Sequence, residues 1–202
     1  MSAQQTVVAA RTGVLIARTW GLRPLGLGLA GVVVLSSAWQ GPVSIPVRQD
    51  VAEVVWPLAP CLFALVIPGV AARAHTDQER CAPRSAWRRR AVFVGVLGAG
   101  MLLAATLLSI FHPFSVVARN GLLLVGLALA CTIGLPQSTR WIPVSFFPIV
   151  TWLLGARSAG DDPAGWAVLL HAPGSAPAFW AATGCFLAGT VLYVVAERPM
   201  RS

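Results

Sequence analysis

The sequence contains no lysine, since all 15 of its basic residues are arginines, and only seven residues are acidic. This absence excludes two kinds of chemistry. A phosphate-binding loop of the Walker type requires its lysine, and Schiff-base catalysis requires a side-chain amine. The chain therefore has no ATPase site of that type of its own.

Charge of either sign is scarce. Charged residues make up 11% of the 202 residues, whereas soluble domains carry roughly 25%. Hydrophobic residues make up 56%, and the mean hydropathy is +0.73. A soluble domain of this size could not bury so much apolar surface, because small domains bury only part of it. We therefore expect a polytopic membrane protein whose remaining apolar surface is covered by the lipid bilayer.

Residues that hold metals or cofactors are few and scattered. No pair of the four cysteines has C-x-x-C spacing, and three of them fall in apolar runs, where they read as small apolar filler. No H-E-x-x-H motif occurs, and the three histidines fall in loops or near the ends of apolar runs. We expect no catalytic, metal or cofactor-binding residue, and hence not an enzyme.

The net charge of +8 and the pI near 11.2 would suit a nucleic-acid-binding protein. That interpretation needs a basic face on a soluble domain, however, and here the arginines punctuate apolar runs. Membrane topology explains them better, and we expect no nucleic-acid partner.

Six apolar runs are read as transmembrane helices, with short ones accommodated by tilt or local thinning. Their approximate bounds are 24–39, 51–72, 91–111, 115–135, 141–155 and 178–196. The expected fold is all-α, with a transmembrane region over 24–196 and a tail over 197–202.

The arginines predict the orientation. With both termini in the cytoplasm, 12 arginines lie in cytoplasmic segments and three in outer segments, which is the bias of the positive-inside rule. Arg119 is one of the outer three. A charge costs several kcal/mol at mid-bilayer, so we expect the fourth span to begin after it.

Residues 1–23 read as a helix lying on the cytoplasmic leaflet, with an extended start to the first span as the alternative. Small residues recur at four-residue spacing in the later spans, which allows close helix contact, although the high alanine and glycine content also produces such pairs by chance. These pairs are Gly126 with Ala130, Gly184 with Ala188, and Cys185 with Gly189.

The longest cytoplasmic connection, residues 73–90, carries a capping-box pattern in which Thr76 caps a helix and Glu79, after Asp77, reaches back. Pro83 would limit that helix to about two turns. Three arginines then precede the third span: Arg88, Arg89 and Arg90. The loop reads either as a docking helix for a cytoplasmic partner or as a basic loop that sets topology near anionic lipids.

The outer segment 156–177 places Asp162 as an N-cap before Pro163 at the first helical position. An apolar stretch containing Trp166 follows and ends at His171. A helix here would be too short to cross the bilayer and too apolar for water, so we expect a re-entrant or surface-lying helix in the outer leaflet.

In this order, the features resemble the membrane subunit of an ABC-2-type ABC transporter, a family best known for exporters. The resemblance is one of layout and covers the whole chain: 7–21, 76–90 and 162–171 stand where the family has an interfacial helix, a coupling helix and an outer helix. It implies a permease that pairs with a separate cytoplasmic ABC ATPase subunit, which binds the ATP, and with a second membrane subunit.

Under that resemblance the ATPase contacts residues 76–79. The alternative is a non-transporting accessory or scaffold subunit of a membrane complex. Heavy use of alanine, arginine, glycine and valine without lysine indicates a high-GC bacterial genome, and so a bacterial plasma membrane.

Overall fold

The computed structural model describes residues 22–38, 41–45, 48–79, 86–156 and 162–195, with the backbone alone at 22, 44–45, 48–53, 73–79 and 86. The expected interfacial helix over 1–23 and the tail over 197–202 lie almost wholly outside this part. The described helices are α2 (Leu22–Ala38), α3 (Pro60–Glu79), α4 (Ala86–Leu108), α5 (Phe114–Gly134), α6 (Trp141–Gly155) and α7 (Ala176–Val195). Two 3-10 turns, η1 (Trp56–Leu58) and η3 (Val168–Leu170), and two strands, β1 (Pro42–Ile45) and β2 (Arg48–Val54), complete the elements.

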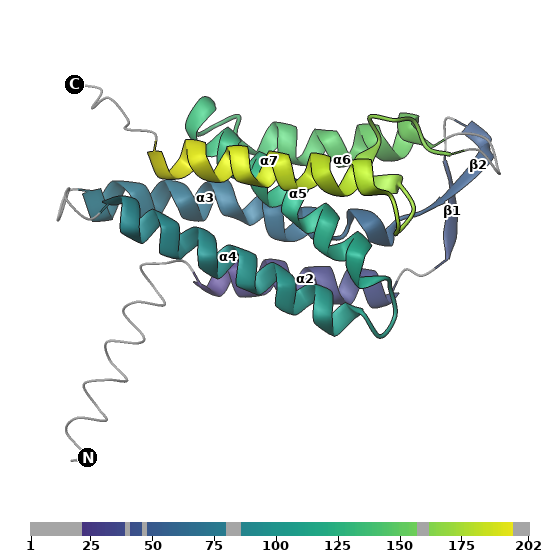
Figure 1. Cartoon of the computed structure of the whole chain (residues 1–202), viewed down its shortest axis with the longest axis horizontal. Coiled ribbons are helices and arrows are strands. Elements are labelled where there is room, and N and C mark those ends of the chain that lie inside the picture. Colours follow the sequence, from purple (N-terminus) through teal and green to yellow (C-terminus); the bar gives the residue numbers. More distant parts are fainter. Residues whose placement is uncertain (1–21, 39–40, 46–47, 80–85, 157–161, 196–202) are drawn as a thin grey trace, which may run out of the picture.

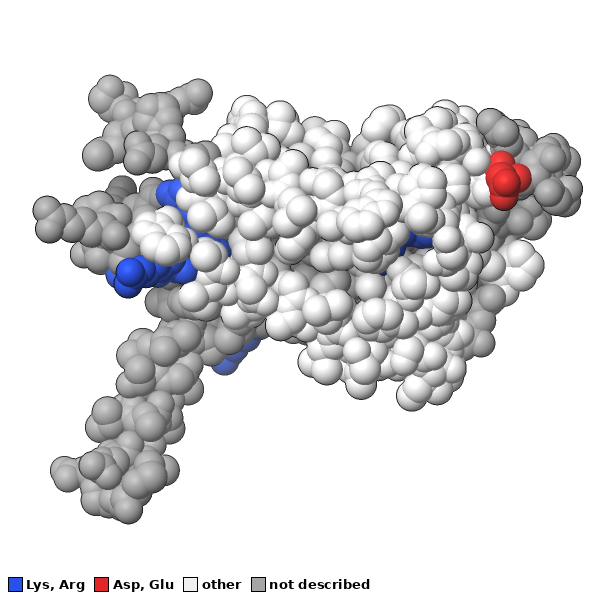
Figure 2. Space-filling model, in the orientation of Figure 1, with Lys and Arg blue, Asp and Glu red and all other residues white. Residues whose placement is uncertain are grey.

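The six long helices lie side by side and alternate in direction along one axis (Figure 1). The start of α2, the end of α3, the start of α4, the α5–α6 connection and the end of α7 share one end of the bundle. We call it the arginine end, after the described arginines there: Arg23, Arg88, Arg89, Arg90 and Arg140. The opposite end, with β1, β2, the α4–α5 turn and η3, is the hairpin end. Figure 2 shows most of the blue side chains at the first end, a further blue patch among white side chains toward the second end, and red at the second end.

Three described helices are long and apolar enough to cross a membrane: Trp87–Leu108, Phe114–Gly134 and Ala176–Val195. The apolar parts of α2, α3 and α6 are shorter. At 1.5 Å per residue the 15 residues of α6 span about 22 Å, less than a hydrocarbon core of about 30 Å. The helical, membrane-compatible character is confirmed, and each expected run overlaps one of the six described α-helices.

The second run was predicted too long at its start. Residues 51–54 belong to β2, which pairs antiparallel with β1, and η1 follows before α3 begins at Pro60. Two prolines explain this. Pro57 and Pro60 lack a backbone N–H, and Pro60 favours the first position of a helix. The valines at 51, 54 and 55 therefore extend the apolar run in the sequence, but they do not belong to the helix.

The capping box over 76–79 is also wrong. Thr76 lies inside α3, which is continuous from Pro60 to Glu79, whereas an N-cap residue has a non-helical backbone. The alanines that precede Thr76, at 71, 72 and 74, are the strongest helix formers and carry α3 onward.

The outer segment forms no helix at Asp162 and Pro163. Its described residues over 162–175 have irregular backbone and turns apart from the 3-10 turn η3. The N–H of Ala164 donates to the carbonyl of Gly155 at 2.9 Å, a group at the end of α6 that has no intrahelical partner. A local helix does not form here because Gly165 disfavours a helical backbone and because the backbone groups of this segment bond to other elements.

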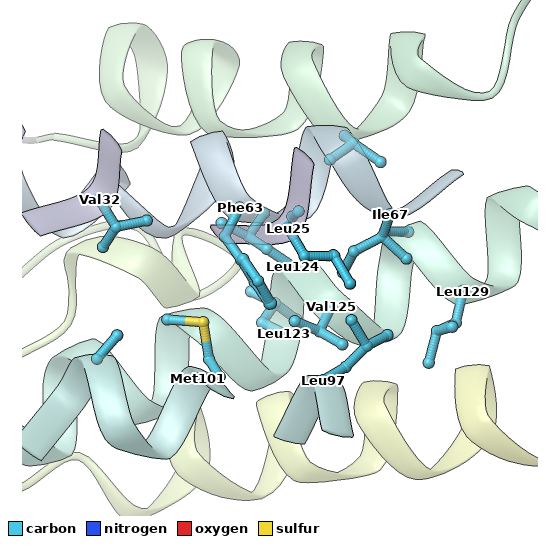
Figure 3. Close-up of a cluster of buried hydrophobic side chains, with 14 of the residues drawn as sticks. Leu25, Val32, Phe63, Ile67, Leu97, Met101, Leu123, Leu124, Val125 and Leu129 are labelled. Carbon is cyan, nitrogen blue, oxygen red and sulfur yellow. The ribbon is translucent and has the colours of Figure 1, made fainter. Parts of the chain in front are cut away.

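Helix α5 runs through the centre of the bundle. In its most apolar stretch 78% of the residues are buried, against 22% for α7. Figure 3 shows leucines of α5 meeting Phe63 and Ile67 of α3 and Leu97 and Met101 of α4. Met101 also lies over Gly121, where a Cβ would come within 2.5 Å of its Cγ. The interior between the helices is therefore filled by side chains.

Glycine permits the closest helix contact. A Cβ on Gly126 of α5 would lie 2.6 Å from the carbonyl oxygen of Cys185 on α7, and one on Gly189 would strike the backbone of Gly126. Two of the small-residue pairs therefore contribute to one α5–α7 contact. The third pair does not, because a Cβ on Gly184 would meet nothing within 4 Å.

Candidate functional site at the hairpin end

Arg119 is the largest fully buried side chain among the described residues, with 1% of its surface exposed. The fourth span was expected to begin after Arg119; helix α5 begins at Phe114 and includes Arg119 in its second turn. All residues over 116–121 are buried. At this level α5 has no outward face, since η1, η3 and the neighbouring helices surround it.

The guanidinium of Arg119 binds backbone carbonyls of the outer segment. Nη2 donates to the carbonyl of His171 at 2.8 Å and lies 3.5 Å from that of Leu169, and Nη1 donates to that of Ala172 at 3.1 Å. Nε donates to Oδ1 of Asn120 at 3.1 Å. These bonds fix the irregular segment after η3 against α5.

Asn120 completes the arrangement. Its Nδ2 donates to the carbonyls of Pro57 and Leu169, both at 2.9 Å, while its Oδ1 accepts from Arg119. One side chain thereby joins α5 to η1 and η3. We call Arg119, Asn120 and the carbonyls of residues 57, 169, 171 and 172 the Arg119 cluster.

Within the described part of the chain, Arg119 bonds only to neutral groups, the Asn120 amide and three backbone carbonyls. A buried cation without an anion loses its hydration and regains only what carbonyl and amide dipoles supply. Ionisable residues inside membrane helices are rare and typically functional for this reason. The Arg119 cluster is therefore the candidate functional site of the described chain.

A second polar contact joins other elements at the same end. Nε2 of His112, in the α4–α5 turn, lies 2.9 Å from the carbonyl of Ser36, and the imidazole stacks on Trp56 with ring centroids 4.1 Å apart and 13° between the planes. The Ser36 carbonyl is among the last of α2, which have no intrahelical donor. The two contacts together bind α2, η1, α5 and η3 at the hairpin end.

The arginine end uses the same chemistry on helix ends. Nη1 of Arg90 lies 3.4 Å from the carbonyl of Tyr193 and 3.3 Å from that of Val194, the last carbonyls of α7. Nε of Arg140 donates at 2.8 Å to Leu135, the C-cap of α5. A guanidinium at a helix C-terminus satisfies open carbonyls and opposes the negative end of the helix dipole.

The predicted docking residues lie at the arginine end, but they differ in availability. Thr76, Asp77 and Glu79 occupy the last turns of α3, with only their backbone described. Arg88 is exposed, with its Cζ 5.4 Å from the ring centroid of Trp87, whereas Arg90 is engaged with α7. Arg89 is half-buried and has a contact of its own.

The predicted outer residues do not form one site. Asp162 is exposed, and 48% of Trp166 is exposed in a turn. Pro163 is half-buried, and His171 takes part through its carbonyl rather than its ring. The residues that hold this segment, Arg119 and Asn120, were not predicted as site residues. The signal was present, since adjacent arginine and asparagine interrupt an apolar run in which a charge is costly.

Within the described ranges, no three or more His, Cys, Asp or Glu side chains are placed to hold a metal ion. No protein-family model matches the chain, and neither does any curated protein or solved structure. The role of the Arg119 cluster therefore has to be inferred from its own chemistry.

Proposed function

We propose that this chain is the membrane-spanning permease subunit of an ATP-driven transporter of the ABC-2 type, an exporter of a bacterial plasma membrane. The observation that carries the proposal is the gathering at the arginine end of the starts of α2 and α4 and the ends of α3 and α7. Because basic segments stay on the cytoplasmic side, we infer that this end, where the described chain begins with α2 and ends with α7, faces the cytoplasm.

Large apolar side chains on the outside of the helices support the membrane location. On α4 these include Val96, Leu103 and Leu107, and on α7 they include Leu187 and Val191. Exposed tryptophans stand at the ends of the helices, with Trp87 at the start of α4, Trp141 at the start of α6 and Trp180 at the start of α7. An indole at a membrane interface keeps its ring in lipid and its N–H in water.

The partner follows from what the chain lacks and from where α3 ends. Without a lysine there is no Walker loop, so ATP must be hydrolysed by another subunit. The apolar part of α3 ends at Ala72, and the helix continues for seven polar-rich residues to Glu79, about two turns. This extension and the exposed Arg88 form the docking surface for a cytoplasmic ABC ATPase.

The transport path is shared with a second membrane subunit. Among the described residues the interior of the bundle is closed by Val32, Ile67, Leu97, Leu124 and Leu129, each fully or almost fully buried. A packed core of this kind leaves no polar route between the helices of one subunit. The route therefore lies between two such subunits, and ATP-driven closure of the ATPases moves one against the other.

Co-purification tests this function. The tagged chain is expressed with its native neighbouring genes, solubilised gently, and its bound proteins are identified by mass spectrometry. We expect a stoichiometric soluble ATPase of about 25–35 kDa, the size that the family resemblance implies. A chain that purifies alone, or only with membrane proteins that are not ATPases, contradicts the proposal.

That contradicting result favours the second candidate, a non-transporting accessory or scaffold subunit. The specific observation in its favour is the same closed core, together with outer segments held by Asn120 and His112. A scaffold needs a rigid apolar body and no path. The two candidates separate on whether the purified complex hydrolyses ATP.

A further inference from the structure

The four hydrogen bonds of the Arg119 guanidinium differ in how deeply their acceptors are buried. Nε and the longer Nη2 contact face buried groups, the Asn120 side chain and the Leu169 carbonyl. The bonds of Nη1 and Nη2 to the carbonyls of Ala172 and His171 are only partly buried. Each of the two terminal nitrogens therefore bonds to a carbonyl of a residue that lies at least partly at the surface of the hairpin end.

That edge is covered by a thin layer of backbone. His171 is half-buried, and Ala172, Pro173 and Gly174 are exposed, in a stretch of bend and turn between η3 and α7. The carbonyls of His171 and Ala172 bond the two terminal nitrogens from this side. The low overall exposure of Arg119 therefore depends in part on where these residues of irregular chain lie.

The two covering carbonyls occupy the positions that an anion takes. A phosphate or carboxylate binds arginine through two oxygens, one on each terminal nitrogen, in a planar bidentate pair. Here one carbonyl oxygen lies 3.1 Å from Nη1 and the other 2.8 Å from Nη2. Neutral carbonyls form weaker bonds to a cation than an anion does, and they leave its charge uncompensated.

The surroundings indicate what carries the anion. Exposed apolar side chains at the hairpin end include Ile110, Phe111, Phe114 and Trp180, which suit acyl chains and the boundary between chains and headgroups. An anion attached to an acyl chain would present its headgroup at this level. A free inorganic anion would gain nothing from these residues.

We propose that Arg119 is the receptor for the anionic headgroup of an amphiphile, a phosphate or carboxylate that replaces the carbonyls of His171 and Ala172. Asn120 opposes binding, because its bond to the Leu169 carbonyl holds η3, which leads directly into the covering residues, against α5. As a substrate class for export, such an amphiphile rests on the proposed transporter function. The headgroup site itself does not need the ATPase.

Titration of the purified full-length chain with n-dodecyl phosphate in dodecyl maltoside micelles, with bound ligand counted by native mass spectrometry, tests this site. The wild type binds one dodecyl phosphate. Arg119→Gln weakens binding at least about tenfold, since it removes a charged hydrogen-bonding partner. The matched control, Arg88→Gln, removes an exposed arginine at the other end and leaves the Kd unchanged.

Asn120→Ala should change the affinity for dodecyl phosphate in the opposite direction from Arg119→Gln. It keeps the charge of Arg119 and releases the covering segment, so dodecyl phosphate binds more tightly than to the wild type. A purely structural cluster predicts weaker binding for both cluster variants. The Asn120 variant also decides the matter if Arg119→Gln does not fold.

Three results overturn the proposal: equal weakening by Arg119→Gln and Arg88→Gln, weaker binding by Asn120→Ala, or inorganic phosphate competing as well as dodecyl phosphate. The last would indicate a free-anion site. Because no ATPase is present, failure here leaves the co-purification result standing. Failure of co-purification would leave a site for anionic lipid.

Discussion

The Sγ of Cys61 on α3 lies 3.4 Å from the carbonyl oxygen of Val144 on α6. That carbonyl is the one that Pro148, four residues later, cannot bond, because proline has no N–H. The thiol of one helix thus supplies the donor missing from another. A cysteine that looked like apolar filler also acts as a weak hydrogen-bond donor.

Replacing this thiol should lower stability by an amount that depends on whether a hydrogen-bond donor remains. Cys61→Ala removes it and should lower the free energy of unfolding by about 1 kcal/mol, whereas Cys61→Ser keeps a donor and should lose less. Thermal unfolding in the same detergent measures both. Equal stability of the two variants would show that the contact carries no hydrogen-bond energy.

The close α5–α7 contact should not tolerate a methyl group. Gly189→Ala forces a Cβ against the backbone of Gly126, so we expect a loss of about 1–3 kcal/mol. Gly184→Ala, on the same helix with open space beside it, is the matched control. It should be neutral or stabilising by up to about 1 kcal/mol, because alanine favours the helix. Similar losses for both variants would contradict the contact.

Arg90 contacts the carbonyls at the end of α7, whereas Arg88 is exposed, so we expect their replacement to affect stability differently. Arg90→Gln should destabilise the protein by about 1 kcal/mol through the open carbonyls at the end of α7, and should increase proteolysis after Val195. Arg88→Gln, which removes an exposed charge two residues away, should change stability by less than about 0.5 kcal/mol. Limited proteolysis and thermal unfolding of the pair test this, and a reversed order would refute it.

The docking surface should be separable from folding. Asp77→Asn and Glu79→Gln together change the polar end of α3 without touching its apolar part, so thermal stability should stay near that of the wild type. Under the transporter proposal, substrate-stimulated ATPase activity of the purified complex falls. Unchanged stimulation would place the docking surface elsewhere.

The parts of the fold set by composition could be predicted from the sequence, and the parts set by partners could not. Unbroken apolar runs predict α4 to α7 to within about five residues at each end, because each run is bounded by polar residues, proline or glycine. The start of α3 was missed because hydropathy counts Val51 and Val54 as apolar whether they are helical or extended. The prolines at 57 and 60 carried the correct information.

The candidate site was missed for a different reason. Arg119 was treated as a charge that must avoid the span, since an isolated arginine there is costly. The free-energy cost of burying Arg119 is offset by the carbonyls of His171 and Ala172, some 50 residues away. No local sequence pattern predicts that pairing. The same segment was predicted to be a helix because Asp162 and Pro163 form a good helix-start signal. Its backbone instead hydrogen-bonds to other elements, at Gly155 and Arg119.

Photo-crosslinking of the purified complex tests the central claim most directly, because it asks which end of the bundle meets the ATPase. A photoreactive amino acid replaces Gln78, at the polar end of α3, or Trp166, at the hairpin end. The account predicts a crosslink to the ATPase from position 78 and none from position 166. A crosslink from 166, or none from 78 in a complex that contains the ATPase, would contradict it.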